Sequence, residues 1–138
     1  EENNLMDIVC YAALAYPDRE ALLQRLQALA PVEGFVACET LDELNSSLLR
    51  PLGDILAVVL FPADDADLAN ILVLREVLVN TRIVLILPTW EPDLVTGAHF
   101  LRPRFMTTRE MGFEDVGAVL EKLAKKSGCS NASTIEGR

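Results

Sequence analysis

Short apolar runs and stripes of leucine at helical spacing alternate along the chain. One run, residues 54–62, reads Asp-Ile-Leu-Ala-Val-Val-Leu-Phe-Pro and is apolar at both odd and even positions. Neither face of such a strand is polar enough to be exposed to water, which is typical of a strand covered by helices above and below. Residues 54–62 are therefore predicted to form the central strand.

Four other segments predict the remaining strands, and apolar stripes between them predict helices. The further strands are expected at residues 6–14, 34–38, 82–87 and 104–107. Helices are expected from Arg19, after Thr40, from Asp64 to about Val79, over 92–101 and over 113–126. Thr40 and Glu43 have the spacing of a capping box. Strands that alternate with helices in this way predict an α/β domain with a parallel sheet and helices on both faces.

Composition narrows the class of protein. The chain of 138 residues carries 21 acidic and 12 basic residues, for a net charge of −9, which disfavours a direct nucleic-acid partner. Its apolar runs are strand-sized and short of the ~20 residues that a membrane helix needs, so no membrane association is expected. The three cysteines show no metal-type spacing, which favours a soluble protein of the reducing cytoplasm. We expect one domain over residues 5–127 and a tag or linker remnant over 128–138.

The strand–helix alternation, the length and the apolar run 54–62 before a helix resemble the receiver domains of two-component response regulators. The resemblance covers nearly all of the expected domain and implies a flavodoxin-like (βα)5 three-layer sandwich with strand order 2-1-3-4-5. In such sheets the ligand site lies at the carboxyl ends of the strands. For receivers this is the phosphorylation site.

The residues that perform phosphotransfer in receivers are replaced in this sequence. The phosphoacceptor aspartate stands four positions before a proline, and that position is Val58. The acidic pair that holds magnesium corresponds to the stretch Tyr-Ala-Ala-Leu-Ala at residues 11–15. Thr89 and Arg102 match the remaining receiver positions only loosely. The resemblance therefore implies a pseudo-receiver, without enzymatic activity, metal or cofactor.

A domain of this kind is expected to act through protein contacts, either with a partner protein or with itself as a homodimer. By analogy with receivers, the interface is expected around the fifth strand and the last helix, at Phe100, Arg102, Arg104, Phe105 and Arg109. Arginines there could contact an acidic partner or form a solvated edge.

An alternative function is small-ligand or metal binding in a crevice at the strand ends. The candidate crevice residues are Ala12, Phe61, Asp64, Asp65, Thr89 and Trp90. Acidic residues there also suit a helix start, which we prefer to a cation site. Trp90 could be a binding anchor or a lid over the vacated site. Phosphorylation at Asp64 or Asp65 is a third hypothesis.

Two cysteines, Cys10 and Cys38, are expected on neighbouring strands, where they could form a redox-sensitive pair. Buried apolar thiols keep a high pKa and react slowly, so inert packing is the preferred interpretation. His99 is the only histidine and has no partner at a catalytic spacing.

Overall fold

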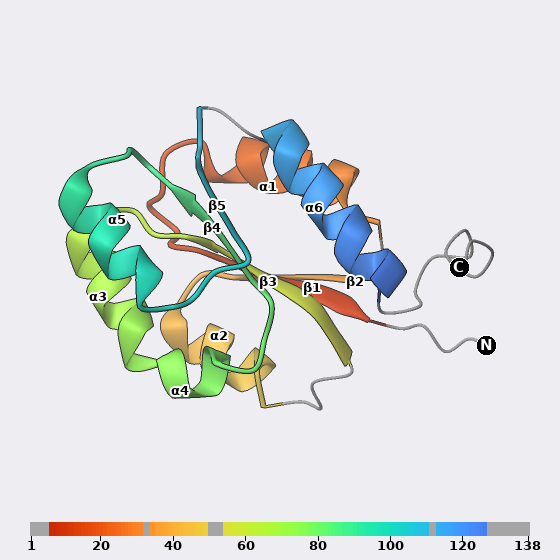
Figure 1. Cartoon of the computed structure of the whole chain (residues 1–138), viewed down its shortest axis with the longest axis horizontal. Helices are drawn as coiled ribbons and strands as arrows, with labels where there is room; N and C mark the ends of the chain where they lie inside the picture. Colours follow the sequence, from red (N-terminus) through yellow and green to blue (C-terminus); the bar gives the residue numbers. More distant parts are fainter. Residues whose placement is uncertain (1–5, 32–33, 50–53, 111–112, 127–138) are drawn as a thin grey trace.

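The computed structural model describes residues 6–31, 34–49, 54–110 and 113–126, and these form a five-stranded parallel sheet with helices on both faces (Figure 1). The strand order is β2-β1-β3-β4-β5. The strands are β1 (Asp7–Ala12), β2 (Gly34–Cys38), β3 (Ile55–Phe61), β4 (Ile83–Leu87) and β5 (Phe105–Thr108). The helices are α1 (Arg19–Leu29), α2 (Leu41–Ser47), α3 (Asp65–Val73), α4 (Arg75–Leu78), α5 (Pro92–His99) and α6 (Phe113–Lys126). The predicted flavodoxin-like sandwich and its strand order are confirmed.

Two hydrophobic cores lie on either side of the sheet. Helices α1 and α6 cover one face, while α2, α3, α4 and α5 cover the other (Figure 1). Strand β3 is buried at every position and contributes Val59 and Phe61 to the first core and Val58 and Leu60 to the second. This division follows from the alternation of side chains along a strand. The predicted central strand is therefore confirmed.

The first strand ends earlier than the apolar run predicts. Strand β1 stops at Ala12, and a turn follows in which the Tyr16 amide donates to the Ala13 carbonyl at 2.9 Å. This turn leaves Leu14, which the sequence places in the strand, 69% exposed. The turn also directs Tyr16 back into the core, where it is buried.

The predicted third helix is two helices. The chain bends at Leu74, whose backbone has φ −92° and ψ 9°. The amides of Leu74 and Val77 donate to carbonyls three residues earlier, which is the tighter geometry of a 3₁₀ turn. The bend lets the short helix α4 bury Leu78. The helical stripe in the sequence did not reveal it, because a single tight turn hardly disturbs the spacing of apolar residues.

Local signals at other helix ends are confirmed. Thr40 Oγ1 accepts from the Glu43 amide at 3.1 Å, and Glu43 accepts from the Glu39 amide at 2.7 Å. Helix α5 covers Pro92–His99 and ends two residues before the predicted range 92–101. Gly97 also has a packing role, since a Cβ there would lie 3.1 Å from Leu68 Cδ2 of α3.

Within the described ranges, no helix combines the length and apolar character that crossing a bilayer requires. The segment 128–138, expected to be a tag or linker remnant, lies outside the described residues, as does Cys129.

Candidate functional site

Aromatic side chains pack at the carboxyl ends of β1 and β3, where the resemblance to receivers predicts a phosphotransfer site. Ala12 and Phe61 are register partners at the carboxyl ends of β1 and β3, and both are buried. The Tyr16 ring packs edge-on against Phe61, with ring centroids 5.7 Å apart. The Tyr16 hydroxyl is buried and has no hydrogen-bond partner among the described residues. Burial raises the pKa of this phenol, and the Arg109 charge partly opposes the rise.

Two arginines complete this strand-end cluster, which we define as Ala12, Tyr16, Arg19, Phe61 and Arg109. The Arg109 guanidinium lies over the Tyr16 ring, 5.2 Å from its centroid, and donates to Asp18 Oδ2 at 3.3 Å. Asp18 directly precedes α1. Its side chain makes no cap bond, and its backbone has a φ of 58°.

Arg19, like Tyr16, is a residue of this cluster that was not recognised in the sequence. It is 93% buried, since its relative exposure is 7%. Its Nε donates to the Ala12 carbonyl at 2.8 Å, and its second terminal nitrogen donates to the Cys38 carbonyl at 3.2 Å. The guanidinium thus joins the carboxyl ends of β1 and β2. The position of Arg19 in the sequence was a signal for such a role. An arginine in the first turn of a helix is unfavourable because its charge opposes the helix dipole, so another interaction is expected to stabilise it there.

The strand-end cluster does not fit a magnesium ion. Magnesium requires oxygen ligands, usually carboxylates, in near-octahedral geometry. Strands β1 and β3 end in Ala12 and Phe61, and Arg19 brings a positive charge to the same end of the sheet. A cation there would meet apolar walls and a like charge.

Val58, which the resemblance to receivers assigns to the phosphoacceptor position, lies within β3 and ahead of its end at Phe61. It is fully buried, with Val9 and Ile83 as its register partners on the two neighbouring strands. Phe61 rather than Val58 therefore lies at the carboxyl end of the strand. Neither side chain carries an oxygen that could accept a phosphoryl group.

The acidic residues after β3 are used for helix capping. Asp64 Oδ1 accepts from the Asp67 amide at 2.8 Å, and Asp67 Oδ2 accepts from the Ala63 amide at 2.9 Å. The Tyr11 hydroxyl donates to Asp67 Oδ1 at 3.0 Å. Burial, the hydrogen bond to Asp67 and its charge together raise the pKa of Tyr11. In the described part of the chain, no three His, Cys, Asp or Glu side chains gather as metal ligands would.

The other predicted crevice residues lie on the surface. Asp65 and Thr89 are exposed, and the Thr89 hydroxyl accepts from the Glu91 amide at 3.3 Å. Trp90 is 46% exposed in the same loop. The structure thus brings Ala12 and Phe61 together in the core and leaves Asp64, Asp65, Thr89 and Trp90 at the rim.

The predicted interface residues belong to different parts of the surface. Phe100 is 61% exposed, and Arg102 and Arg104 are exposed ahead of β5. Phe105 is half-buried against the core beneath α1 and α6. Arg109 follows β5 and belongs to the strand-end cluster. Only the first three can share a surface near the start of β5.

A groove adjoins that surface. The α4–α5 groove has a volume of about 450 Å³ and is lined by Arg75, Glu76, Val79, His99, Phe100, Leu101 and Arg102. Val79 is 59% exposed and was not recognised in the sequence, because a valine at the end of a helical stripe reads as core. The bend at Leu74 presents α4 to this groove.

Cys10 and Cys38 lie on neighbouring strands but face opposite sides of the sheet. Cys10 is the register partner of Ala37, and Cys38 is the partner of Tyr11. Cys10 packs in the core under α1 and α6, whereas Cys38 packs in the other core. Burial raises the pKa of both thiols. The hypothesis of a directly bonded redox pair is therefore wrong, because the sheet separates the two sulfur atoms.

Comparison with known proteins gives a fold relationship. No protein-family model matches the sequence, and no curated protein matches it. Among solved structures, the chain is similar to a protein of Burkholderia pseudomallei described as pilus assembly-related, with a TM-score of 0.65 and 13% sequence identity. The match covers 95% of this chain and 96% of the other. At this identity the similarity shows a shared fold.

Proposed function

We propose that this chain is a receiver-like domain that cannot be phosphorylated, has no enzymatic activity and acts through protein contacts. The observation that carries the proposal is the end of β3, where Phe61 is buried beneath the Tyr16 ring. Phosphotransfer needs a carboxylate nucleophile and a metal that neutralises the phosphoryl oxygens. An apolar strand end with the Arg19 guanidinium beside it supplies neither.

Two further observations favour contacts between proteins. Phe100 and Val79 are large apolar side chains exposed beside one groove, and a grouping of this kind often marks an interaction surface. The description of the fold relative as pilus assembly-related is in keeping with a role in assembly.

The proposal is tested by intact-mass spectrometry after incubation with acetyl phosphate and Mg²⁺. The expected result is an unchanged mass, while a phosphorylatable receiver treated in parallel gains one phosphoryl group. A stoichiometric gain of one phosphoryl group on this chain would overturn the proposal. Peptide mapping would then show whether Asp64 or Asp65 had accepted it.

A further inference from the structure

The α4–α5 groove is a locally basic surface on an acidic chain. Arg75 and Arg102 stand in its lining and are exposed, while Glu76 is the one acidic side chain there. Neither arginine makes an ion pair within the described residues. Phe100 and Val79 supply exposed apolar surface between these charges. The groove thus fits an acidic surface that also offers apolar contact.

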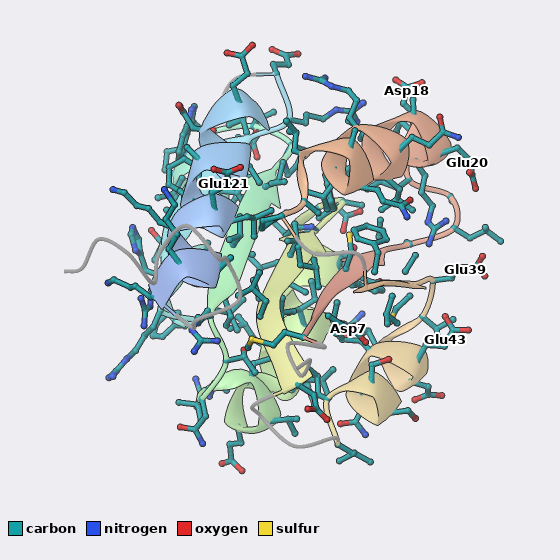
Figure 2. The ribbon with its side chains drawn as sticks, turned by 90° about the vertical axis from the view of Figure 1, so that its right-hand side faces the viewer. Asp7, Asp18, Glu20, Glu39, Glu43 and Glu121 are labelled. Carbon is teal, nitrogen blue, oxygen red and sulfur yellow. The ribbon has the colours of Figure 1, made fainter. Side chains whose placement is uncertain are left out.

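The opposite edge of the same sheet is such a surface. The β2 rim, as we define it, carries the exposed acids Glu20, Glu39, Asp42 and Glu43, from α1, the end of β2 and the start of α2. Figure 2 shows Glu20, Glu39 and Glu43 in a row along one margin of the molecule. A hollow of about 380 Å³ opens beside the rim, with Val36, Ala37 and Cys38 in its lining together with Asp42, Glu43, Ser46 and Ser47.

Strand β2 also offers backbone groups. It lies at the edge of the sheet and pairs on one side with β1. An edge strand presents unpaired amides and carbonyls that another chain can use. Ala37, the fourth of the five residues of β2, is exposed, so β2 is accessible to solvent at this point.

We propose that a second copy of this chain docks its acidic β2 rim against the basic α4–α5 groove of the first. In this contact Arg75 and Arg102 face Glu39 and Asp42 of the partner copy, and Phe100 enters the hollow beside β2. The inference rests on the proposed function, because it names the partner of a domain that acts through contacts.

Charge decides between this arrangement and a symmetric dimer. A two-fold dimer through the groove would place Arg75 and Arg102 of one copy against the same two arginines of the other. A two-fold dimer through the β2 rim would place the four acidic residues of one copy against the four of the other. Like charges across an interface are unfavourable. The net charge of −9 opposes any association of copies, but salt screens charges beyond about 8 Å under physiological conditions. Complementary patches therefore decide the orientation, which is head to tail.

A head-to-tail contact leaves one groove and one rim free at the two ends of every assembly. Association of this kind continues into open chains unless the rotation between copies closes a ring. The expected behaviour is a weight-average mass that rises with protein concentration above the 15.2 kDa of one chain. High salt is expected to reduce this rise, since ion pairs supply part of the contact.

Sedimentation velocity of two complementary variants tests the inference. The groove variant is R75E/R102E, and the rim variant is E39K/D42K, which leaves the capping residues Thr40 and Glu43 in place. Each variant alone is expected to be monomeric, because one half of the contact is reversed. An equimolar mixture is expected to associate again, because the intact rim of one variant meets the intact groove of the other and the two reversed surfaces are also opposite in charge.

The matched control is K122E/K125E on α6, which changes the net charge by the same amount as the groove variant. Both lysines are exposed and outside the proposed contact. This control is expected to associate within a few-fold of the wild type, while the groove variant is weakened about tenfold or more, the effect of losing about 1.4 kcal/mol. Circular dichroism establishes that each variant is folded.

A wild-type chain that stays monomeric at all concentrations would overturn the head-to-tail contact, as would a mixture of the variants that stays monomeric. Either result would leave the proposed lack of phosphotransfer standing, because that is measured separately by mass.

Discussion

Arg19 shows how a single residue ties the ends of two strands together. Its guanidinium donates to the carbonyls of Ala12 and Cys38, which lie at the carboxyl ends of β1 and β2. A buried charge is costly unless its hydrogen bonds are made. We therefore regard Arg19 as part of the closure of this end of the sheet.

At the residue scale, the first prediction concerns Arg19→Met. The substitution leaves the Ala12 and Cys38 carbonyls without their donor, so the free energy of unfolding should fall by about 2 to 4 kcal/mol. Urea denaturation measures this free energy of unfolding. Lys122→Met, at an exposed position on α6, serves as the control and should change stability by about 0.5 kcal/mol or less. An Arg19 variant as stable as this control would contradict the structural role.

The two described thiols give a second prediction. In a Cys129→Ser background, Cys10 and Cys38 should resist iodoacetamide in the native protein and react fully in denaturant, because both are buried and their pKa values are raised. Intact-mass spectrometry gives the number of thiols that iodoacetamide has modified. Treatment with diamide should leave the mass unchanged, and a loss of two hydrogen atoms would reveal a disulfide that the sheet geometry forbids.

At the scale of elements, substitutions of Asp64 at the start of α3 distinguish a helix cap from a cation site. Asp64 accepts the Asp67 amide, so Asp64→Ala should lose about 1 kcal/mol of stability. Asp64→Asn keeps a capping oxygen and should lose about 0.5 kcal/mol or less. Thermal unfolding with and without Mg²⁺ measures both effects. Equal losses in the two variants, together with stabilisation of the wild type by Mg²⁺, would favour a metal role.

Most elements could be predicted from periodicity because a buried parallel strand and an amphipathic helix have different apolar spacings. The capping box at Thr40 was readable for the same reason, since two residue types at a fixed spacing make the contact. The bend at Leu74 was not readable, because it depends on how α4 packs Leu78 against the sheet. The exposed position of Leu14 likewise depends on a turn that the apolar run conceals.

At the scale of the whole molecule, the candidate site was only partly predictable. The resemblance to receivers implies that the phosphotransfer residues are replaced, and the structure places Tyr16, Arg19 and Arg109 near the carboxyl ends of β1 and β3. Tyr16 and Arg19 lie near the start of α1 and Arg109 follows β5, so only the fold brings these two segments together with the end of β3. The groove was missed for a similar reason, since its lining joins α4 to the end of α5.

Buried titratable groups predict how global stability depends on pH. Burial raises the pKa values of Cys10, Tyr11, Tyr16 and Cys38 in the folded chain. Groups with a raised folded pKa contribute stability that is fully present below their unfolded values, about 8.5 for cysteine and about 10 for tyrosine. That stability is lost as pH rises toward the folded values. The urea midpoint should therefore fall between pH 8 and pH 10.5, and a constant midpoint would contradict the burial of these groups.

We propose that the strand ends form a packed aromatic cluster instead of a phosphotransfer site. Two-dimensional amide NMR tests this most directly, since Ala63 follows β3 and Thr89 and Trp90 follow β4, at the end of the sheet where the resemblance to receivers places Mg²⁺ and the phosphoryl group. Adding Mg²⁺ and then acetyl phosphate should leave these signals unmoved. Saturable shifts at these signals, with an unperturbed remainder of the spectrum, would show a working site and contradict the account.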